Sequence, residues 1–199
     1  MKIGILGGTF NPPHKGHISL ARAAMEECSL SQVIFMPSGI SYFKNGTGVL
    51  SARIRSEMTE LAIRAEAGFV IDDREAIRNT NSYTSDTLKQ LRNEKKSDEF
   101  YYIIGADTLF SIEKWKSPEV IFKEAVLTVE IREGYDLQPL KEQIDRLKRL
   151  YGASIFLLKH PAVDISSTRI RELSRQGKDI SAYVPAAVAD YIEQHRLYE

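Results

Sequence analysis

The sequence has little cysteine, no excess of either charge and no long apolar run. It contains a single cysteine, so no disulfide can form within the chain. Its 27 basic and 27 acidic residues give a net charge of +0, which argues against a general attraction to nucleic acid or membranes. No segment reaches the roughly 18 apolar residues of a membrane helix, and the first apolar run breaks at Gly7-Gly8. We therefore expect a cytoplasmic protein that binds neither membranes nor nucleic acid.

The length of the chain and its apolar pattern predict an α/β fold. With 199 residues, 43% of them hydrophobic, the chain can form one domain with a sizeable core. Apolar runs bounded by turn residues alternate with segments of helical period, as in βαβ units. The expected strands are residues 2–6, 32–36, 69–71, 99–104, 125–129 and 154–158. The expected helices are residues 16–28, 51–67, 84–93, 118–124, 139–150, 167–175 and 185–195. We predict one doubly wound, Rossmann-like domain over residues 1–199, with a mostly parallel sheet and helices on both faces.

The first expected strand ends in a turn that is rich in potential phosphate-binding groups. It reads Gly7-Gly8-Thr9-Phe10-Asn11-Pro12-Pro13-His14-Lys15-Gly16-His17, and a helical pattern follows. In open α/β sheets ligands bind beyond the carboxyl ends of strands, where a helix N-terminus offers N–H donors to anions. His14 and His17 are three residues apart, so we expect them to face the same way. The turn predicts a phosphate site, and Gly7 and Gly8 would let the backbone approach the ligand closely.

Other interpretations of this turn stay open. The sequence has neither the P-loop pattern nor the Gly-x-Gly-x-x-Gly dinucleotide fingerprint, so any phosphate site is of another kind. The two histidines can instead be unrelated surface residues or metal ligands. Zinc would need a third ligand, and the nearby Cys28 lies in the body of the following helix. We therefore nominate no metal-binding residue.

A second candidate phosphate site follows the last expected strand. The segment Asp164-Ile165-Ser166-Ser167-Thr168-Arg169-Ile170-Arg171 places hydroxyl groups where a helix starts. Ser166 or Ser167 can be an ordinary helix N-cap. With Arg171 one turn further on, the same helix start can clamp phosphate through hydroxyl, backbone N–H and guanidinium donors. Two helix N-termini directed at one crevice would hold a polyphosphate.

A third group of residues has the character of a nucleoside site. The segment Ile103-Ile104-Gly105-Ala106-Asp107 ends a buried strand in a turn of small residues, on which a flat base or a ribose can lie. Asp107 can accept hydrogen bonds from ribose hydroxyls, or it can cap a helix. Trp115 is the single tryptophan and lies between charged residues, so we expect an exposed ring that stacks on an aromatic ligand.

Together, the three motifs resemble those of the bacterial nicotinate-nucleotide adenylyltransferases, within the HxGH nucleotidylyltransferase superfamily. They are the Gly-Gly-Thr-Phe-Asn-Pro-Pro-His-Lys-Gly-His turn, the Ile-Gly-Ala-Asp turn with its downstream Lys-Trp, and Ile-Ser-Ser-Thr-x-Ile-Arg. Ser82-Tyr83-Thr84 and Trp115 favour the nicotinate branch. The resemblance implies one nucleotidylyltransferase domain that transfers AMP from ATP to nicotinate mononucleotide, assisted by Mg²⁺. The products would be nicotinate adenine dinucleotide and pyrophosphate, in NAD synthesis.

The resemblance also implies a role for each matching residue. The residues that act on the reacting phosphates would be Thr9, His14, His17 and Arg171. ATP would be bound by Gly7, Gly8, Thr9, His14, His17, Gly105, Asp107, Ser167, Thr168 and Arg171. The mononucleotide would be bound by Lys44, Tyr83, Thr84 and Trp115, with Trp115 stacking on the pyridine ring. Because the mononucleotide's own phosphate attacks the α-phosphorus of ATP, we expect no covalent nucleophile.

Several alternatives remain at this stage. The chain departs from the family pattern at Phe43, which precedes Lys44 where better-known members have histidine. An adenylyltransferase acting on nicotinamide mononucleotide or phosphopantetheine is the nearest enzymatic rival. A nucleotide-binding sensor without turnover and a zinc hydrolase built on the histidine pair belong to other classes. A homodimer is compatible with the resemblance, but no feature of the sequence establishes one.

Overall fold

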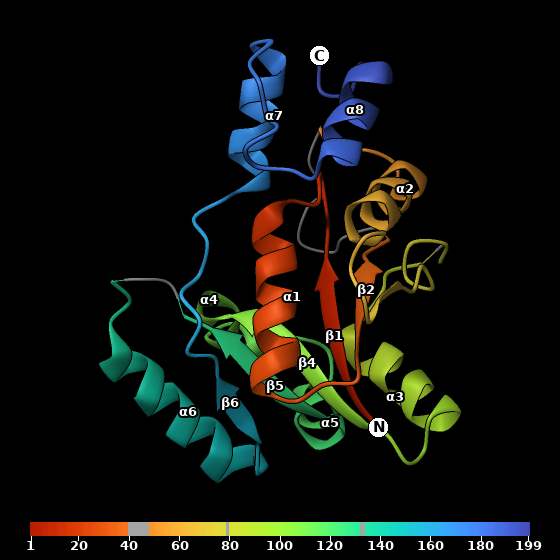
Figure 1. Cartoon of the computed structure of the whole chain (residues 1–199). Coiled ribbons are helices and arrows are strands. Elements are labelled where there is room, and N and C mark those ends of the chain that lie inside the picture. The colour runs from red at the N-terminus through yellow and green to blue at the C-terminus, as the bar shows by residue number, and fades with distance from the viewer. Residues whose placement is uncertain (40–47, 79, 132–133) are drawn as a thin grey trace.

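The computed structural model describes residues 1–39, 48–78, 80–131 and 134–199. Six strands form one sheet in the order β3-β2-β1-β4-β5-β6, and every pairing is parallel. The strands are β1 (Lys2–Gly8), β2 (Gln32–Pro37), β3 (Phe69–Ile71), β4 (Glu99–Gly105), β5 (Ala125–Glu130) and β6 (Ile155–Leu157). The helices are α1 (Lys15–Glu27), α2 (Ala52–Ile63), α3 (Thr84–Glu94), α4 (Ala106–Leu109), α5 (Pro118–Glu124), α6 (Leu137–Tyr151), α7 (Ser167–Arg175) and α8 (Ala186–Gln194). Figure 1 shows their arrangement.

The strand order explains where a ligand can bind. From β1 the chain builds outward through β2 to β3, then returns to the other side of β1 and builds outward through β4, β5 and β6. The two halves meet between β1 and β4, which is the topological switch point of a doubly wound sheet. Ligands of such sheets bind in the crevice beyond the carboxyl ends of the strands at that point. The strand order therefore predicts a ligand site at the turns after β1 and β4.

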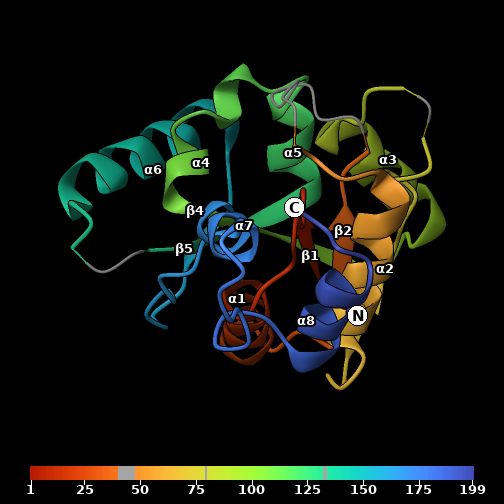
Figure 2. The ribbon, with the colours of Figure 1, turned by 90° about the horizontal axis from the view of Figure 1, so that it is seen from above.

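Each face of the sheet is covered by its own set of helices, as the view from above shows (Figure 2). The first apolar core packs α1, α2, α7 and α8 against one face, and it contains Ile18, Met58, Ile170 and Val188. The second core packs α3, α5 and α6 against the other face through residues such as Leu91, Ile121 and Leu147. Strands covered on both faces have nearly continuous apolar sequences, as β4 does.

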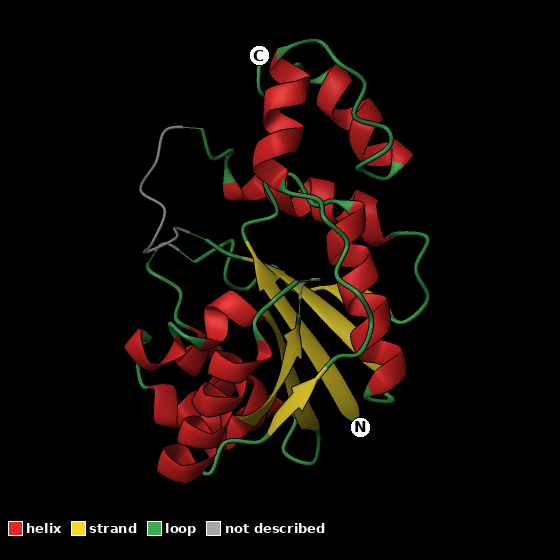
Figure 3. Ribbon diagram, turned by 90° about the vertical axis from the view of Figure 1, so that its left-hand side faces the viewer, coloured by secondary structure: helices red, strands yellow, loops and turns green. Residues whose placement is uncertain are grey.

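The C-terminal helices extend the molecule beyond the carboxyl ends of the strands (Figure 3). Ile170 of α7 has no exposed surface, and the terminal Leu197 and Tyr198 are both 8% exposed within the first core. The apolar side of α7 is thus buried, and this burial holds the helix beside the switch point. Among the described residues, no helix is long and apolar enough to cross a membrane.

The structure confirms the predicted fold class, because the sheet is parallel and helices cover both faces. All six expected strands and all seven expected helices are present, with ends that differ by a few residues. The sequence pattern missed the short helix α4 and the single 3-10 turn at Ile112–Lys114. Both are too short to show a helical period, and both follow β4, where the nucleoside site was expected.

Shortening Ile170 tests the packing of α7. Ile170→Ala should lower the free energy of unfolding by about 2–5 kcal/mol, because it leaves a cavity in a site with no exposed surface. Arg169→Ala is the matched control, since the Arg169 side chain is exposed and, among the described residues, its ion pair is an exposed one of 3.7 Å with Glu172. Urea unfolding of both variants measures the difference. A loss below about 1 kcal/mol in Ile170→Ala would contradict the described packing.

Candidate active site

A cleft of about 610 Å³ opens at the switch point. Its walls come from the turn after β1, the turn after β4 and the start of α7. These segments lie far apart in the sequence, and the fold brings them to one place. The predicted ATP-binding residues that line the cleft are Gly8, Thr9, His14, His17, Gly105, Asp107, Ser167, Thr168 and Arg171.

His14 and His17 face the same way, as their spacing predicted. Their rings stack with centroids 3.6 Å apart and planes 21° apart. His14 is the N-cap residue of α1, and its backbone N–H donates to Nδ1 of His17 at 3.1 Å. Because Nδ1 accepts this bond, a neutral His17 carries its proton on Nε2. The start of α1 thus sets the tautomer of His17.

His14 is buried, with 7% of its surface exposed. Among the described residues its Nδ1 atom has no hydrogen-bond partner. Burial lowers the pKa of His14 to about 4, so the ring is neutral at pH 7. A buried polar atom without a partner, in the wall of a cleft, is typical of a ligand-binding group.

The zinc interpretation of this pair finds no support in the described part of the chain. No group of three or more His, Cys, Asp or Glu side chains could hold a metal ion there. Cys28 is buried and contacts Thr128 at 4.0 Å. It is the C-cap residue of α1, at the opposite end of the helix from His14 and His17. The histidine pair is thus part of a helix start and not of a described metal centre.

The start of α7 is joined directly to the turn after β1. Ser167 Oγ donates to the carbonyl oxygen of Pro12 at 2.9 Å, and Arg171 Nη1 donates to the carbonyl oxygen of Asn11 at 2.9 Å. Arg171 Nη2 also donates to Thr168 Oγ1 at 3.2 Å. These bonds bring the N-termini of α1 and α7 to one cleft, which is the arrangement expected for a polyphosphate.

One alternative for this segment is confirmed, but for Ser166 alone. Ser166 is the N-cap of α7, and its Oγ accepts a hydrogen bond from the backbone N–H of Arg169 at 3.2 Å. Ser167 and Thr168 follow it in the first turn of the helix, and both line the cleft. Capping therefore occupies Ser166, while the next two hydroxyl groups join the start of α7 to Pro12 and Arg171 in the wall of the cleft.

The turn after β4 leaves open space above its backbone. A Cβ atom added to Gly105 would meet no atom within 4 Å. Asp107 lies in the first turn of α4, and its Oδ1 accepts a hydrogen bond from the Tyr135 hydroxyl at 3.3 Å. The N-cap of this helix is Gly105, so the capping alternative for Asp107 is wrong. An open backbone beside an exposed carboxylate is a suitable surface for a ribose.

The role of Gly7 stays a prediction, while the expected exposure of Trp115 needs correction. Gly7 does not line the described cleft, and a Cβ atom there would come within 2.9 Å of the Tyr102 hydroxyl, so the turn requires glycine at this position. Trp115 is half-buried and not exposed, because its ring packs on the second core and meets Tyr102 edge to face at 6.3 Å. The sequence analysis predicted an exposed ring because the sequence neighbours of Trp115 are charged.

Two of the predicted mononucleotide-binding residues, Thr84 and Trp115, contact Tyr102. Thr84 Oγ1 and the Tyr102 hydroxyl are 3.2 Å apart, and burial raises the pKa of Tyr102 to about 12. Tyr83 precedes Thr84, and the Lys116 ammonium lies over the Tyr83 ring at 4.4 Å. The ring of Trp115 also contacts Tyr102. Lys44 lies outside the described residues.

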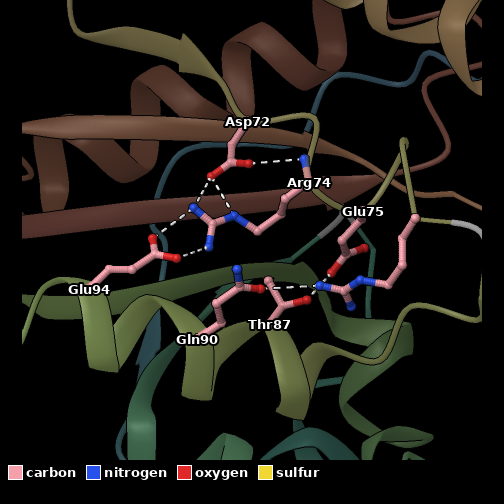
Figure 4. Close-up of polar contacts among 7 residues, drawn as sticks. Asp72, Arg74, Glu75, Thr87, Gln90 and Glu94 are labelled. Atoms are coloured by element: carbon pink, nitrogen blue, oxygen red, sulfur yellow. Dashed lines mark hydrogen bonds and ion pairs between the residues drawn. The ribbon is translucent and has the colours of Figure 1, made fainter.

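A network of ion pairs and hydrogen bonds joins the segment after β3 to α3 (Figure 4). Arg74 lies between Asp72 and Glu94, with ion pairs of 2.7 Å and 2.9 Å. Next to them Glu75 accepts a hydrogen bond from Thr87 Oγ1 at 2.6 Å. Glu94 and Thr87 belong to α3, so these contacts fix the segment after β3 to the helix that begins with Thr84.

Sequence reasoning missed that Asn11 and its partner Tyr198 hold the turn after β1. Asn11 is 4% exposed, and its side-chain amide donates to the carbonyl oxygen of Gly48 at 3.0 Å. Its Oδ1 accepts hydrogen bonds from the Leu50 N–H at 3.3 Å and from the Tyr198 hydroxyl at 3.0 Å. The motif contained Asn11 but gave no sign of its partners, since Tyr198 is 187 residues away.

Comparisons with known proteins identify the family of the chain. Residues 5–173 match the profile of the cytidylyltransferase-like family. A protein of Lachnoclostridium phytofermentans named "Probable nicotinate-nucleotide adenylyltransferase" is 39% identical over 197 residues, covering 99% of this chain and 98% of the relative. A Geobacter metallireducens protein of the same name is 36% identical over 212 residues, covering 100% and 98%. The chain belongs to the nicotinate-nucleotide adenylyltransferase family.

Solved structures agree with the fold of this adenylyltransferase family. The Plasmodium falciparum nicotinic acid mononucleotide adenylyltransferase complexed with NaAD has a TM-score of 0.82 at 19% identity, over 99% of this chain and 97% of that one. A putative nicotinate-nucleotide adenylyltransferase of Vibrio parahaemolyticus has a TM-score of 0.69 at 22% identity, over 99% and 94%. At these identities the likeness shows the fold alone.

The burial of His14 predicts a pH dependence of stability. Its pKa is about 4 in the folded chain and 6.5 in the unfolded chain, so between these values the unfolded chain binds more protons. Stability therefore falls as the pH falls, by about 2 kcal/mol between pH 7 and pH 5 for this group. Urea unfolding at both pH values gives the loss in the free energy of unfolding between pH 7 and pH 5. This loss should be smaller by about that amount in His14→Gln than in the unsubstituted chain. His160→Gln, at an exposed histidine, is the control. Equal declines in His14→Gln and the unsubstituted chain would contradict the burial.

Proposed function

We propose that this chain transfers AMP from ATP to nicotinate mononucleotide, with ATP in the described cleft and the mononucleotide against Tyr83, Thr84 and Trp115. The convergence of the α1 and α7 N-termini on one cleft carries this proposal, because such a pair of helix starts suits a triphosphate. Membership of the nicotinate-nucleotide adenylyltransferase family supports the choice of acceptor.

The reaction requires positioning and charge stabilisation but no covalent intermediate. The mononucleotide phosphate attacks the α-phosphorus of ATP, the bond to the β-phosphate breaks, and pyrophosphate leaves. His17, with Nε2–H as a donor, would bind the oxygens of the reacting α-phosphate, and Thr9 would hold the phosphates beside it. The leaving pyrophosphate would be held by Ser167, Thr168 and Arg171.

His14 would act as a neutral partner in this arrangement. Its ring stacks on His17, and its backbone N–H fixes the orientation of that ring. A phosphate in the cleft would provide the hydrogen-bond partner that His14 Nδ1 lacks among the described residues. We therefore expect His14 to orient His17 and to contact ATP through a neutral ring.

Mg²⁺ fits this site as a companion of ATP. The acidic side chains that line the cleft, among the described residues, are Asp107 and Glu130. Mg²⁺ is usually held by one or two carboxylates together with substrate phosphates, so this donor set suits it. Asp107 and Glu130 are the residues that would supply protein ligands. When bound, the ion would neutralise negative charge on the phosphates.

The position of Thr84 gives a reason to prefer the acid form of the mononucleotide. Thr84 begins α3, so its backbone N–H lies at the positive end of an 11-residue helix. First-turn N–H groups have no partner within the helix and favour a carboxylate over an amide NH₂ group.

A cytoplasmic location, a homodimer and a role for Lys44 stay predictions from the sequence.

An acceptor assay tests the proposed function. The purified chain would receive Mg-ATP with nicotinate mononucleotide, nicotinamide mononucleotide or phosphopantetheine, and pyrophosphate release would be measured. We expect release with nicotinate mononucleotide, together with the dinucleotide product. Release with another acceptor alone would assign the chain to another branch of the superfamily. ATP binding without release for any acceptor would indicate a sensor.

Removing His17 tests its place at the reacting phosphate. His17→Ala should keep the fold and lower kcat by about 10²-fold, the usual scale for losing one transition-state donor. His160→Ala is the control, because His160 is exposed and its ring contacts Ser19 at 3.1 Å, away from the cleft. Steady-state kinetics with circular dichroism measure both effects. Unchanged turnover in a folded His17→Ala chain would remove His17 from the mechanism.

Removing Trp115 tests the pyridine site. Trp115→Ala should raise KM for the mononucleotide by about 2- to 13-fold, since aromatic stacking contributes about 0.5–1.5 kcal/mol. Trp115→Phe keeps a stacking ring and serves as the control. Initial rates with each substrate varied in turn separate the two Michaelis constants. A change confined to KM for ATP would contradict this placement of the ring.

A further inference from the structure

Arg55 of α2 is a buried cation directly behind the phosphate site. It is 2% exposed, and the hydrogen bonds that its guanidinium makes within the described residues go to backbone carbonyl oxygens. Nη1 donates to Thr9 at 2.6 Å, Nη2 donates to Ser38 at 2.6 Å and to Gly39 at 3.2 Å, and Nε donates to Leu50 at 3.0 Å. Within the described ranges, no carboxylate forms an ion pair with it.

A buried guanidinium of this kind is costly for stability alone. Burial lowers the pKa of Arg55, but an arginine remains charged at neutral pH. Buried charges are normally paired, and well-packed apolar residues often stabilise a core better than buried ions do. Carbonyl oxygens satisfy the N–H groups of Arg55 without cancelling its charge. The positive charge is therefore available to an anion on the other side of Thr9.

The four bonds join three separate backbone segments. Thr9 belongs to the turn after β1, Ser38 and Gly39 follow β2, and Leu50 precedes α2. The planar guanidinium holds all three at fixed distances, which a lysine ammonium on a flexible chain cannot do. Thr9 also lines the cleft, so its backbone position determines where its side chain meets a phosphate.

Neighbouring contacts support the same segments from other sides. A Cβ atom at Gly39 would lie 2.3 Å from the carbonyl oxygen of Glu75, so this backbone is pressed against the segment after β3. Asn11 binds the backbone of Gly48 and Leu50. Arg55 is the residue whose side chain contacts the turn after β1 together with both of the other segments.

We propose that Arg55 is a positioning residue for adenylyl transfer, which fixes the Thr9 backbone at the reacting phosphates and adds positive charge behind them. This inference rests on the proposed function. Arg55 contacts no substrate and acts through Thr9. Two effects then separate: the planar geometry governs turnover, and the charge governs the affinity for ATP.

Two substitutions distinguish these effects. Arg55→Lys keeps the charge and loses the planar fork, so ATP affinity should stay within about 3-fold while kcat falls by about 10²-fold, the scale of a 1 Å misplacement. Arg55→Met loses both, so ATP affinity should also weaken by about 10-fold. Arg53→Lys and Arg53→Met are the matched controls on the same helix, because Arg53 is 88% exposed and pairs only with Glu57 at 2.8 Å. Both controls should match the unsubstituted chain.

Calorimetric titration with ATP gives the affinity and the fraction of active sites, and initial rates give kcat and KM per active site. A kcat of Arg55→Lys within 3-fold of the unsubstituted chain would overturn the proposal. If the loss of kcat in Arg55→Lys disappears after correction for the fraction of active sites, the role of Arg55 is merely structural. That result would also overturn the proposal. If Arg55→Met does not fold, Arg55→Lys decides alone. Absence of turnover in the unsubstituted chain is a failure of the proposed function, and unchanged turnover in Arg55→Lys is a failure of this inference.

Discussion

The site depends on one contact, between the start of α7 and the turn after β1. Ser167 and Arg171 donate to the carbonyl oxygens of Pro12 and Asn11, across more than 150 residues of sequence. These bonds fix the start of α7 against the turn from which α1 begins. The apolar side of α7, centred on Ile170, holds the helix there, so the first core and the phosphate site are parts of one arrangement.

The turn after β1 is itself held from several directions by buried polar groups. Asn11 links it to Leu50 and to the terminal Tyr198, and Arg55 holds the carbonyl oxygen of Thr9. Each group satisfies backbone atoms that a long turn would otherwise leave without partners. A turn fixed in this way pays little entropy when a ligand binds, which is the condition for catalysis by positioning.

The sequence was informative where function depends on local pattern. Strands covered on both faces appear as apolar runs, and the Gly-rich turn and the Ser-Ser-Thr helix start are visible as motifs. It was uninformative where contacts cross the fold. The charged neighbours of Trp115 suggested an exposed ring, but the ring packs against Tyr102. The sequence also contained no sign that a side chain at Gly7 would meet that same tyrosine. Arg55 lies in an ordinary helical sequence, and its four backbone partners follow from tertiary structure alone.

The central claim is that the paired starts of α1 and α7 hold the triphosphate of ATP. A crystal structure of the chain with Mg²⁺ and a non-hydrolysable ATP analogue tests it most directly. The account predicts the phosphates between the two helix starts, with His17 at the α-phosphate and Arg171 at the terminal phosphates. Phosphates bound elsewhere, or lying between the helix starts without a contact to Arg171, would contradict it.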